Sequence, residues 1–78
     1  MKTITYQELI ELNSLLEEKS LQVKIHLRDA CGGQAFWIET LKEADIPPQL
    51  YEELKRFFSV KNIEIAFNNS KTEFWSKS

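Results

Sequence analysis

The chain has 78 residues, of which 42% are hydrophobic and 12% aromatic, and its formal net charge is −2. This length predicts a single domain over residues 1–78, with one thin core and no large enclosed active site. Ten basic and twelve acidic residues, without a basic run, argue against nucleic acid or an anionic membrane as the main partner.

Cysteine use and hydropathy indicate a compartment. The single cysteine, Cys31, cannot form an internal disulfide, which excludes a disulfide-stapled secreted fold and fits a reducing environment. The sequence has no apolar stretch of about 18 residues and no signal-peptide pattern. We therefore expect a cytoplasmic protein.

The first element is an amphipathic helix predicted over residues 6–19. Thr5 and Glu8 have the spacing of a capping box, and Ile4 and Leu9 have that of a hydrophobic staple. Leucines then recur at helical intervals opposite a polar face. The apolar set is Leu9, Leu12, Leu15 and Leu16, and the polar set is Glu11, Asn13, Glu17 and Glu18.

A strand follows the helix, because the hydrophobic period falls to two. Leu21, Val23, Ile25 and Leu27 alternate with Gln22, Lys24, His26 and Arg28. This alternation is typical of a strand buried on one face only. A loop is predicted over residues 29–34, where Gly32 and Gly33 supply positive φ and Asp29 bonds its own backbone. A second strand over residues 35–39 completes the hairpin.

The second half repeats this order after a polar connector at residues 40–45. Pro47 and Pro48 open a second helix that we expect to end near Ser59. A strand over 63–67, a hairpin turn at 68–70 and a strand over 72–76 follow. The order predicts an α+β two-layer sandwich, helix-strand-strand-helix-strand-strand. Its four-stranded sheet is mostly antiparallel, with two helices on one face. Whether the halves arose by duplication stays open.

Alternation also divides the side chains between the two faces of the sheet. It places Trp37 and Trp75 on the face away from the helices, among Lys24, His26, Glu64 and Glu73. Two exposed indoles on one face of a small monomer are unusual and tend to mark an interaction surface. Two other readings stay open. Long side chains such as Lys24 can cover the rings, or a bulge can change the register and bury one tryptophan.

The turn around Cys31 has several interpretations. As a reactive thiol, Cys31 would depend on positive charge from Arg28 and His26 to favour the thiolate, with His26 and Asp29 as base and orienting group. As a structural residue, it is a small hydrophobe in a hairpin turn. Arg28, Asp29 and the glycine amides can also form a polar rim for a ligand. One cysteine and one histidine fall short of a structural zinc site, so we expect no metal and no cofactor. A site that shares ligands between two copies of the chain stays open.

The motif Arg28-Asp29-Ala30-Cys31 carries a resemblance to a family of small bacterial proteins named for Arg-Asp-Ala-Cys, or RDAC. The likeness extends into the second helix and the Glu-Phe-Trp run at 73–75. That family has no established activity, so the resemblance implies a grouping and no mechanism. The first half is also similar in outline to A-type iron–sulfur carrier proteins. The paired cysteines that those carriers need near the C-terminus are absent, so no cluster is implied.

The sequence therefore favours a non-enzymatic binding or self-association module that uses the helix-free sheet face and the Cys-Gly-Gly turn. The candidate binding residues are Trp37, Trp75, His26, Arg28, Asp29 and Glu64. We expect a partner protein, a second copy in a homodimer, or a small ligand. The alternative is a thiol-dependent enzyme or redox sensor centred on Cys31. The ligand, the oligomeric state and the strand order stay open.

Overall fold

The first helix begins at its predicted cap. The computed structural model describes residues 3–30, 33–41 and 45–77, with only the backbone of residues 29 and 30, and α1 spans Tyr6–Glu18. The Thr5 hydroxyl accepts a hydrogen bond from the Glu8 N–H at 3.1 Å, and the Glu8 carboxylate accepts one from the Thr5 N–H at 2.8 Å. The predicted capping box is confirmed, and such caps contribute about 1 kcal/mol.

The hairpin that follows has a tighter turn than the sequence predicts. Strand β1 spans Val23–Ala30, β2 spans Gly33–Thr40, and Ala30 pairs directly with Gly33. The predicted loop at residues 29–34 is therefore wrong, because antiparallel pairing continues until a two-residue connection is left. Cys31 and Gly32 lie outside the described residues. At its start, β1 begins at Val23 instead of Leu21, because Gln22 has a positive φ of 57°.

The second half has a helix of the predicted length and shorter strands. Helix α2 spans Pro48–Val60, β3 spans Ile65–Phe67 and β4 spans Glu73–Ser76. The predicted strand over 63–67 loses its first residues to the end of the helix. The Ile63 N–H donates to the Phe58 carbonyl at 2.9 Å, and Asn62 has a positive φ of 59°. The chain therefore becomes extended only after Ile63.

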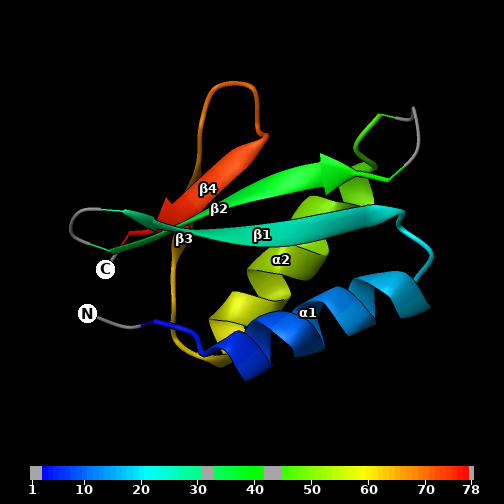
Figure 1. Cartoon of the computed structure of the whole chain (residues 1–78). Coiled ribbons are helices and arrows are strands. Elements are labelled where there is room, and N and C mark those ends of the chain that lie inside the picture. Colours follow the sequence, from blue (N-terminus) through cyan, green and yellow to red (C-terminus); the bar gives the residue numbers. More distant parts are fainter. Residues whose placement is uncertain (1–2, 31–32, 42–44, 78) are drawn as a thin grey trace.

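The four strands form one sheet in the order β1-β2-β4-β3, and every neighbouring pair is antiparallel. Both helices lie on the same face of this sheet (Figure 1). The predicted α+β two-layer sandwich is confirmed. The second strands of the two halves, β2 and β4, meet in the centre, while β1 and β3 form the edges.

The core lies between the sheet and the helices and is built around three phenylalanines. Phe36 and Phe74 stack with ring centroids 4.9 Å apart, and Phe58 of α2 packs edge-on against both. The residues predicted to face the helices do so. Leu21, Val23, Ile25, Phe36, Ile38, Ile63 and Phe74 are buried, and Leu27, Ile65 and Phe67 pack partly buried against them.

Three polar side chains also have structural roles. The Asn13 carboxamide accepts from the Ile25 N–H at 2.8 Å and donates to the Ile25 carbonyl at 3.0 Å. Its placement on the exposed face of the first helix is therefore wrong, because α1 lies along the edge strand β1. Gln34 makes the same two-bond contact with the backbone of Ile4. The buried Glu53 of α2 lies 3.3 Å from Lys19, beyond the end of α1.

Candidate functional site

The face of the sheet opposite the helices carries two adjacent rows of paired residues. In one row His26 lies opposite Trp37, and Trp37 lies opposite Glu73. In the next row the residues run across the sheet as Arg28, Ala35, Trp75 and Ala66. We call these residues the helix-free face: His26, Arg28, Ala35, Trp37, Ala66, Glu73 and Trp75.

Both tryptophans of this face are partly exposed, as the alternation predicts. Trp37 retains 38% of its accessible surface and Trp75 retains 41%. The pairing of β1 with β2 runs without interruption from Val23 to Ala30, so no bulge within those residues turns Trp37 inward. Of the other large exposed apolar side chains, Tyr6, Ile10 and Val60 are on the helices, and Leu41 follows the end of β2. The helix-free face is therefore the place where two large aromatic side chains share one side of the sheet.

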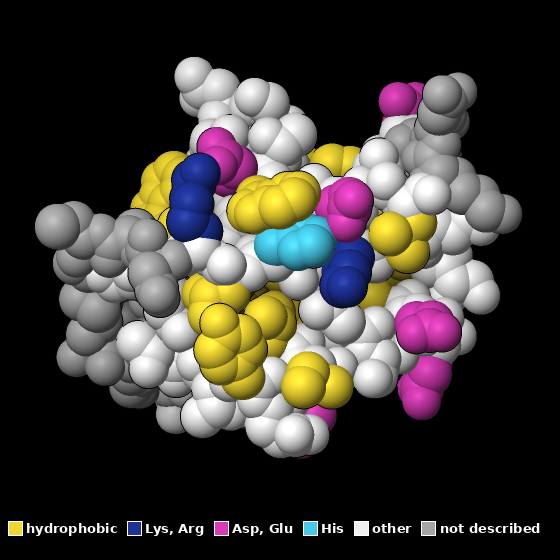
Figure 2. All heavy atoms as spheres, viewed as in Figure 1, with side chains coloured by type: hydrophobic (Ala, Val, Ile, Leu, Met, Phe, Trp, Pro, Cys, Tyr) yellow, Lys and Arg dark blue, Asp and Glu magenta, His cyan; other side chains and the backbone are white. Residues whose placement is uncertain are grey.

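His26 covers one side of Trp37. Their ring centroids are 4.0 Å apart with an interplanar angle of 13°, a stacked arrangement. The His26 Nε2 atom also lies 2.7 Å from the Glu39 Oε1 atom, which fixes the imidazole in place. The cover proposed from the sequence, by Lys24, is thus supplied mainly by a histidine. Figure 2 shows the histidine against a hydrophobic side chain, with acidic and basic groups beside them.

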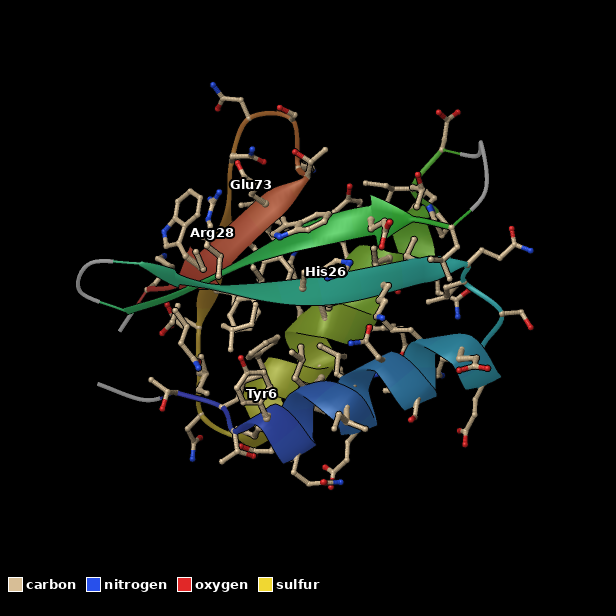
Figure 3. The ribbon with its side chains drawn as sticks, viewed as in Figure 1. Tyr6, His26, Arg28 and Glu73 are labelled. Carbon is tan, nitrogen blue, oxygen red and sulfur yellow. The ribbon has the colours of Figure 1, made fainter. Side chains whose placement is uncertain are left out.

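Arg28 and Glu73 form an ion pair that crosses the central strand β2. The Arg28 Nη2 atom lies 2.8 Å from the Glu73 Oε1 atom, and Figure 3 shows the two side chains reaching toward each other from β1 and β4. The small side chain of Ala35 leaves room for this crossing. By register, the ion pair passes between the two tryptophans. Because both partners are well exposed, such a pair contributes only about 0–1 kcal/mol to stability.

A shallow hollow opens beside Trp37 on its β4 side. It encloses about 280 Å³ and is lined by Arg28, Trp37, Ile38, Thr72 and Glu73. The His26 ring occupies the β1 side of the indole, so the hollow borders the side of Trp37 that carries no stacked ring. The site thus combines a flat apolar wall with a cation and a carboxylate that already hold each other.

The structure does not bring every predicted site residue into this cluster. Glu64 is exposed, lies 3.7 Å from the Lys77 ammonium, and precedes β3 outside the two rows. The backbone of Asp29 pairs with Gln34, while its side chain lies outside the described residues. Cys31 lies there too. The proposed binding role of Asp29 and the proposed reactivity of Cys31 therefore stay predictions.

Two carboxylates of the face were missed as candidate site residues. Glu39 positions His26, and Glu73 positions Arg28. Alternation alone puts both carboxylates on the outward side of their strands. Their partners depend on which residues lie diagonally across the sheet, and this follows from the register and strand order. Knowledge of the strand order β1-β2-β4-β3 would have identified the Arg28–Glu73 pair.

The part of the chain that the structure describes contains neither a cluster of metal ligands nor a helix suited to crossing a membrane. Within 3–30, 33–41 and 45–77, no three His, Cys, Asp or Glu side chains gather closely enough to hold a metal ion. Neither helix in the described part of the chain is long and apolar enough to cross a membrane. No protein-family model, curated protein or solved structure matches the chain.

Proposed function

We propose that this chain is a non-enzymatic, cytoplasmic binding module whose helix-free face docks a protein partner. The observation that carries the proposal is the pair of partly exposed tryptophans, Trp37 and Trp75, on one side of the sheet. Tryptophan and arginine are the residues that most often dominate binding energy at protein interfaces. Self-association through this face is the homomeric form of the same proposal.

The size of the exposed indole surface sets the scale of binding. Two rings that each keep about two-fifths of their surface leave roughly 200 Å² to cover, and covering it would contribute about 5 kcal/mol. Association costs an estimated 4–15 kcal/mol in lost translational and rotational freedom. The tryptophans therefore act as anchors, and a stable complex needs further contacts from the polar residues around them.

Arg28, Glu73 and His26 supply those polar contacts. The Arg28–Glu73 pair is solvent-exposed and weakly held, so a partner carboxylate or ammonium can exchange with either member at small cost. His26 is held by Glu39 against Trp37 and presents its edge beside the indole. Matching charges on the partner would give selectivity more than affinity.

The grouping with the Arg-Asp-Ala-Cys family remains part of this proposal. It rests on Arg28-Asp29-Ala30-Cys31 and adds no activity to it. The cytoplasmic placement is supported by a single cysteine, which a reducing compartment keeps as a free thiol. Cys31 follows Arg28 by three positions in the sequence, and we assign the predicted turn at Cys31 to the rim of the binding surface.

The test replaces both anchors at once in the double variant Trp37→Ala, Trp75→Ala. We expect partner capture in a pull-down to fall at least tenfold. Far-ultraviolet circular dichroism should stay unchanged, because neither ring belongs to the buried core.

The matched control is Tyr6→Ala with Val60→Ala, which removes two apolar side chains that are more exposed but lie on the helices. The control should bind as the unaltered chain does. Unchanged capture by the folded tryptophan variant would rule out the helix-free face as the binding surface. Equal losses in both variants would mean that binding is unspecific adhesion of apolar surface.

A further inference from the structure

The outer edge of β3 has backbone groups without partners in the described part of the chain. Ala66 forms the hydrogen-bonded pair with Trp75, since the flanking bonds run from Asn68 N–H to the Glu73 carbonyl and from Lys77 N–H to the Glu64 carbonyl. In an antiparallel ladder the residues between these pairs point their N–H and C=O groups the other way. Ile65 and Phe67 therefore direct their backbone groups toward the open side of the sheet.

The opposite edge of the sheet, formed by β1, differs because a side chain bonds part of its outward backbone. On β1 the corresponding outward groups of Ile25 are bonded by the Asn13 carboxamide at 2.8 and 3.0 Å. An added strand would have to displace this side chain. None of the side-chain hydrogen bonds described above reaches the outward groups of Ile65 or Phe67. An unshielded apolar edge is a template for pairing with another strand.

The side chains of β3 suit such pairing on both faces. Toward the helices, Ile65 and Phe67 are only partly buried, and a groove of about 460 Å³ runs between β3 and α2. The groove is lined by Lys55, Ser59, Asn62, Ile63, Glu64 and Ile65. On the other face β3 presents only the methyl group of Ala66, next to Trp75. A neighbouring strand can therefore approach without a steric or charged obstacle from β3 itself.

We propose that the occupant of this edge is a second copy of the chain, joined through antiparallel pairing of β3 with β3. The pairing places Ile65 opposite Phe67 of the second copy and Ala66 opposite its counterpart on the two-fold axis. The result is a continuous eight-stranded sheet made of two four-stranded sheets. This surface is separate from the helix-free face, and the inference does not depend on the proposed function.

The second copy is favoured because the edge is complementary to itself. In this register the outward N–H and C=O groups of Ile65 meet those of Phe67, so each donor finds an acceptor. The residue on the axis is the smallest of the strand, and Glu64 lies opposite Asn68 and not opposite another acid. Like charges directly across a strand pair are destabilising, and none occur here. Both partly buried apolar side chains of β3 become covered by the pairing.

Cross-linking at the axis tests the pairing. In a Cys31→Ser background, Ala66→Cys puts one thiol on the axis, where non-hydrogen-bonded partners have Cα atoms about 4.5 Å apart, within the range of a disulfide. The matched control is Ala35→Cys, which lies in the same row and on the same face but inside the sheet. Reactivity of each thiol toward a small aromatic disulfide reagent corrects for exposure.

After that correction, mild oxidation should form the disulfide dimer at least tenfold faster with Ala66→Cys than with Ala35→Cys. The unaltered chain should sediment as a dimer that dissociates on dilution. Ala66→Lys should be a folded monomer, because two ammonium groups would meet on the axis, while Ala35→Lys should still dimerise.

A chain that stays monomeric across the dilution series, with equal cross-linking rates for both thiols, overturns the proposal. Faster cross-linking through Ala35→Cys also overturns it, because that result means the copies associate face to face. Such an outcome would leave the proposed function standing, so the two proposals fail on different observations.

Discussion

The two halves of this molecule use the same order of elements and differ mainly at their edges. In the first half, α1 is followed by two eight-residue strands, and Asn13 bonds the outward backbone of Ile25. In the second half, α2 is followed by strands of three and four residues, and the outer strand lacks such a shield in the described chain. A side chain of the first unit thus bonds its edge strand at Ile25, while no described side-chain hydrogen bond does so on β3.

The centres of the two halves are alike. The second strand of each hairpin carries a Phe-Trp pair, and in each pair the phenylalanine is buried while the tryptophan lies on the helix-free face. Phe36 and Phe74 then stack on each other across the junction of β2 and β4. The core and the helix-free face therefore follow the Phe-Trp pattern that both halves share. The open edge belongs to β3, where the second half differs from the first.

The largest expected effect tests whether Phe36 and Phe74 contribute equally to the stability of the core. Phe36→Ala and Phe74→Ala each remove a fully buried ring and should lower the free energy of unfolding by about 3–5 kcal/mol. Urea denaturation followed by circular dichroism measures both. A loss below about 1 kcal/mol for one of the two would contradict a core shared equally by both halves.

The next largest expected effect comes from removing the Asn13 side chain, which bonds the edge strand β1. Asn13→Ala leaves the outward N–H and C=O of Ile25 without partners, and we expect a loss of about 2 kcal/mol in unfolding free energy. The variant should also associate more strongly than the unaltered chain in sedimentation velocity, because β1 becomes an open edge. Ser14→Ala, an exposed neighbour on the same helix, is the control and should change neither quantity. An Asn13→Ala chain as stable as its parent would refute the shielding role.

A smaller effect concerns the ion pair that joins the halves. The carboxylate of Glu53 is buried in α2 and lies 3.3 Å from both Lys19 and Arg56. Glu53→Gln keeps the shape but removes the charge, and should cost about 1 kcal/mol of unfolding free energy. Glu52→Gln changes an exposed carboxylate one residue earlier and should have no measurable effect. Equal stabilities for the two variants would mean that Glu53 does not couple the helices.

The smallest effect is a pH dependence at the start of α1. Hydrogen bonds from the Lys61 side chain and then from the Thr5 backbone hold the pKa of Glu8 below its ordinary value of 4.5. A lowered folded-state pKa stabilises the fold above the unfolded-state pKa, and this contribution is lost as the pH falls from about 4.5 through the folded value. Urea midpoints should therefore decline less below pH 4.5 in Glu8→Gln than in the parent. An equal decline of the urea midpoint in Glu8→Gln and in the parent would contradict the link between the Glu8 pKa and stability.

The sequence predicted most of the fold because its hydrophobic periods are regular. The leucines of α1, the alternation in β1 and the two prolines at the start of α2 each act over a few neighbouring residues. Predictions failed where a longer-range partner decides the outcome. The 29–34 loop is replaced by strand pairing of Ala30 with Gly33, and Ile63 bonds to the end of α2.

The same distinction applies to the candidate site. Alternation placed Trp37, Trp75, His26 and Arg28 on one face, since it needs only the order of residues along each strand. It could not find the Arg28–Glu73 pair, whose members are 45 positions apart and meet because β4 inserts beside β2. Nor could it assign Asn13 to the edge of β1, because that contact depends on how α1 packs against the sheet.

The most direct test of the central claim measures the accessibility of each indole in the monomer. Trp75→Phe and Trp37→Phe leave one tryptophan each, and acrylamide quenching of the diluted chain reports the remaining ring. We predict long-wavelength emission and efficient quenching for both, with Trp37 quenched less because His26 covers one side of it. Blue-shifted emission and strong shielding of both rings in a proven monomer would contradict an exposed binding face.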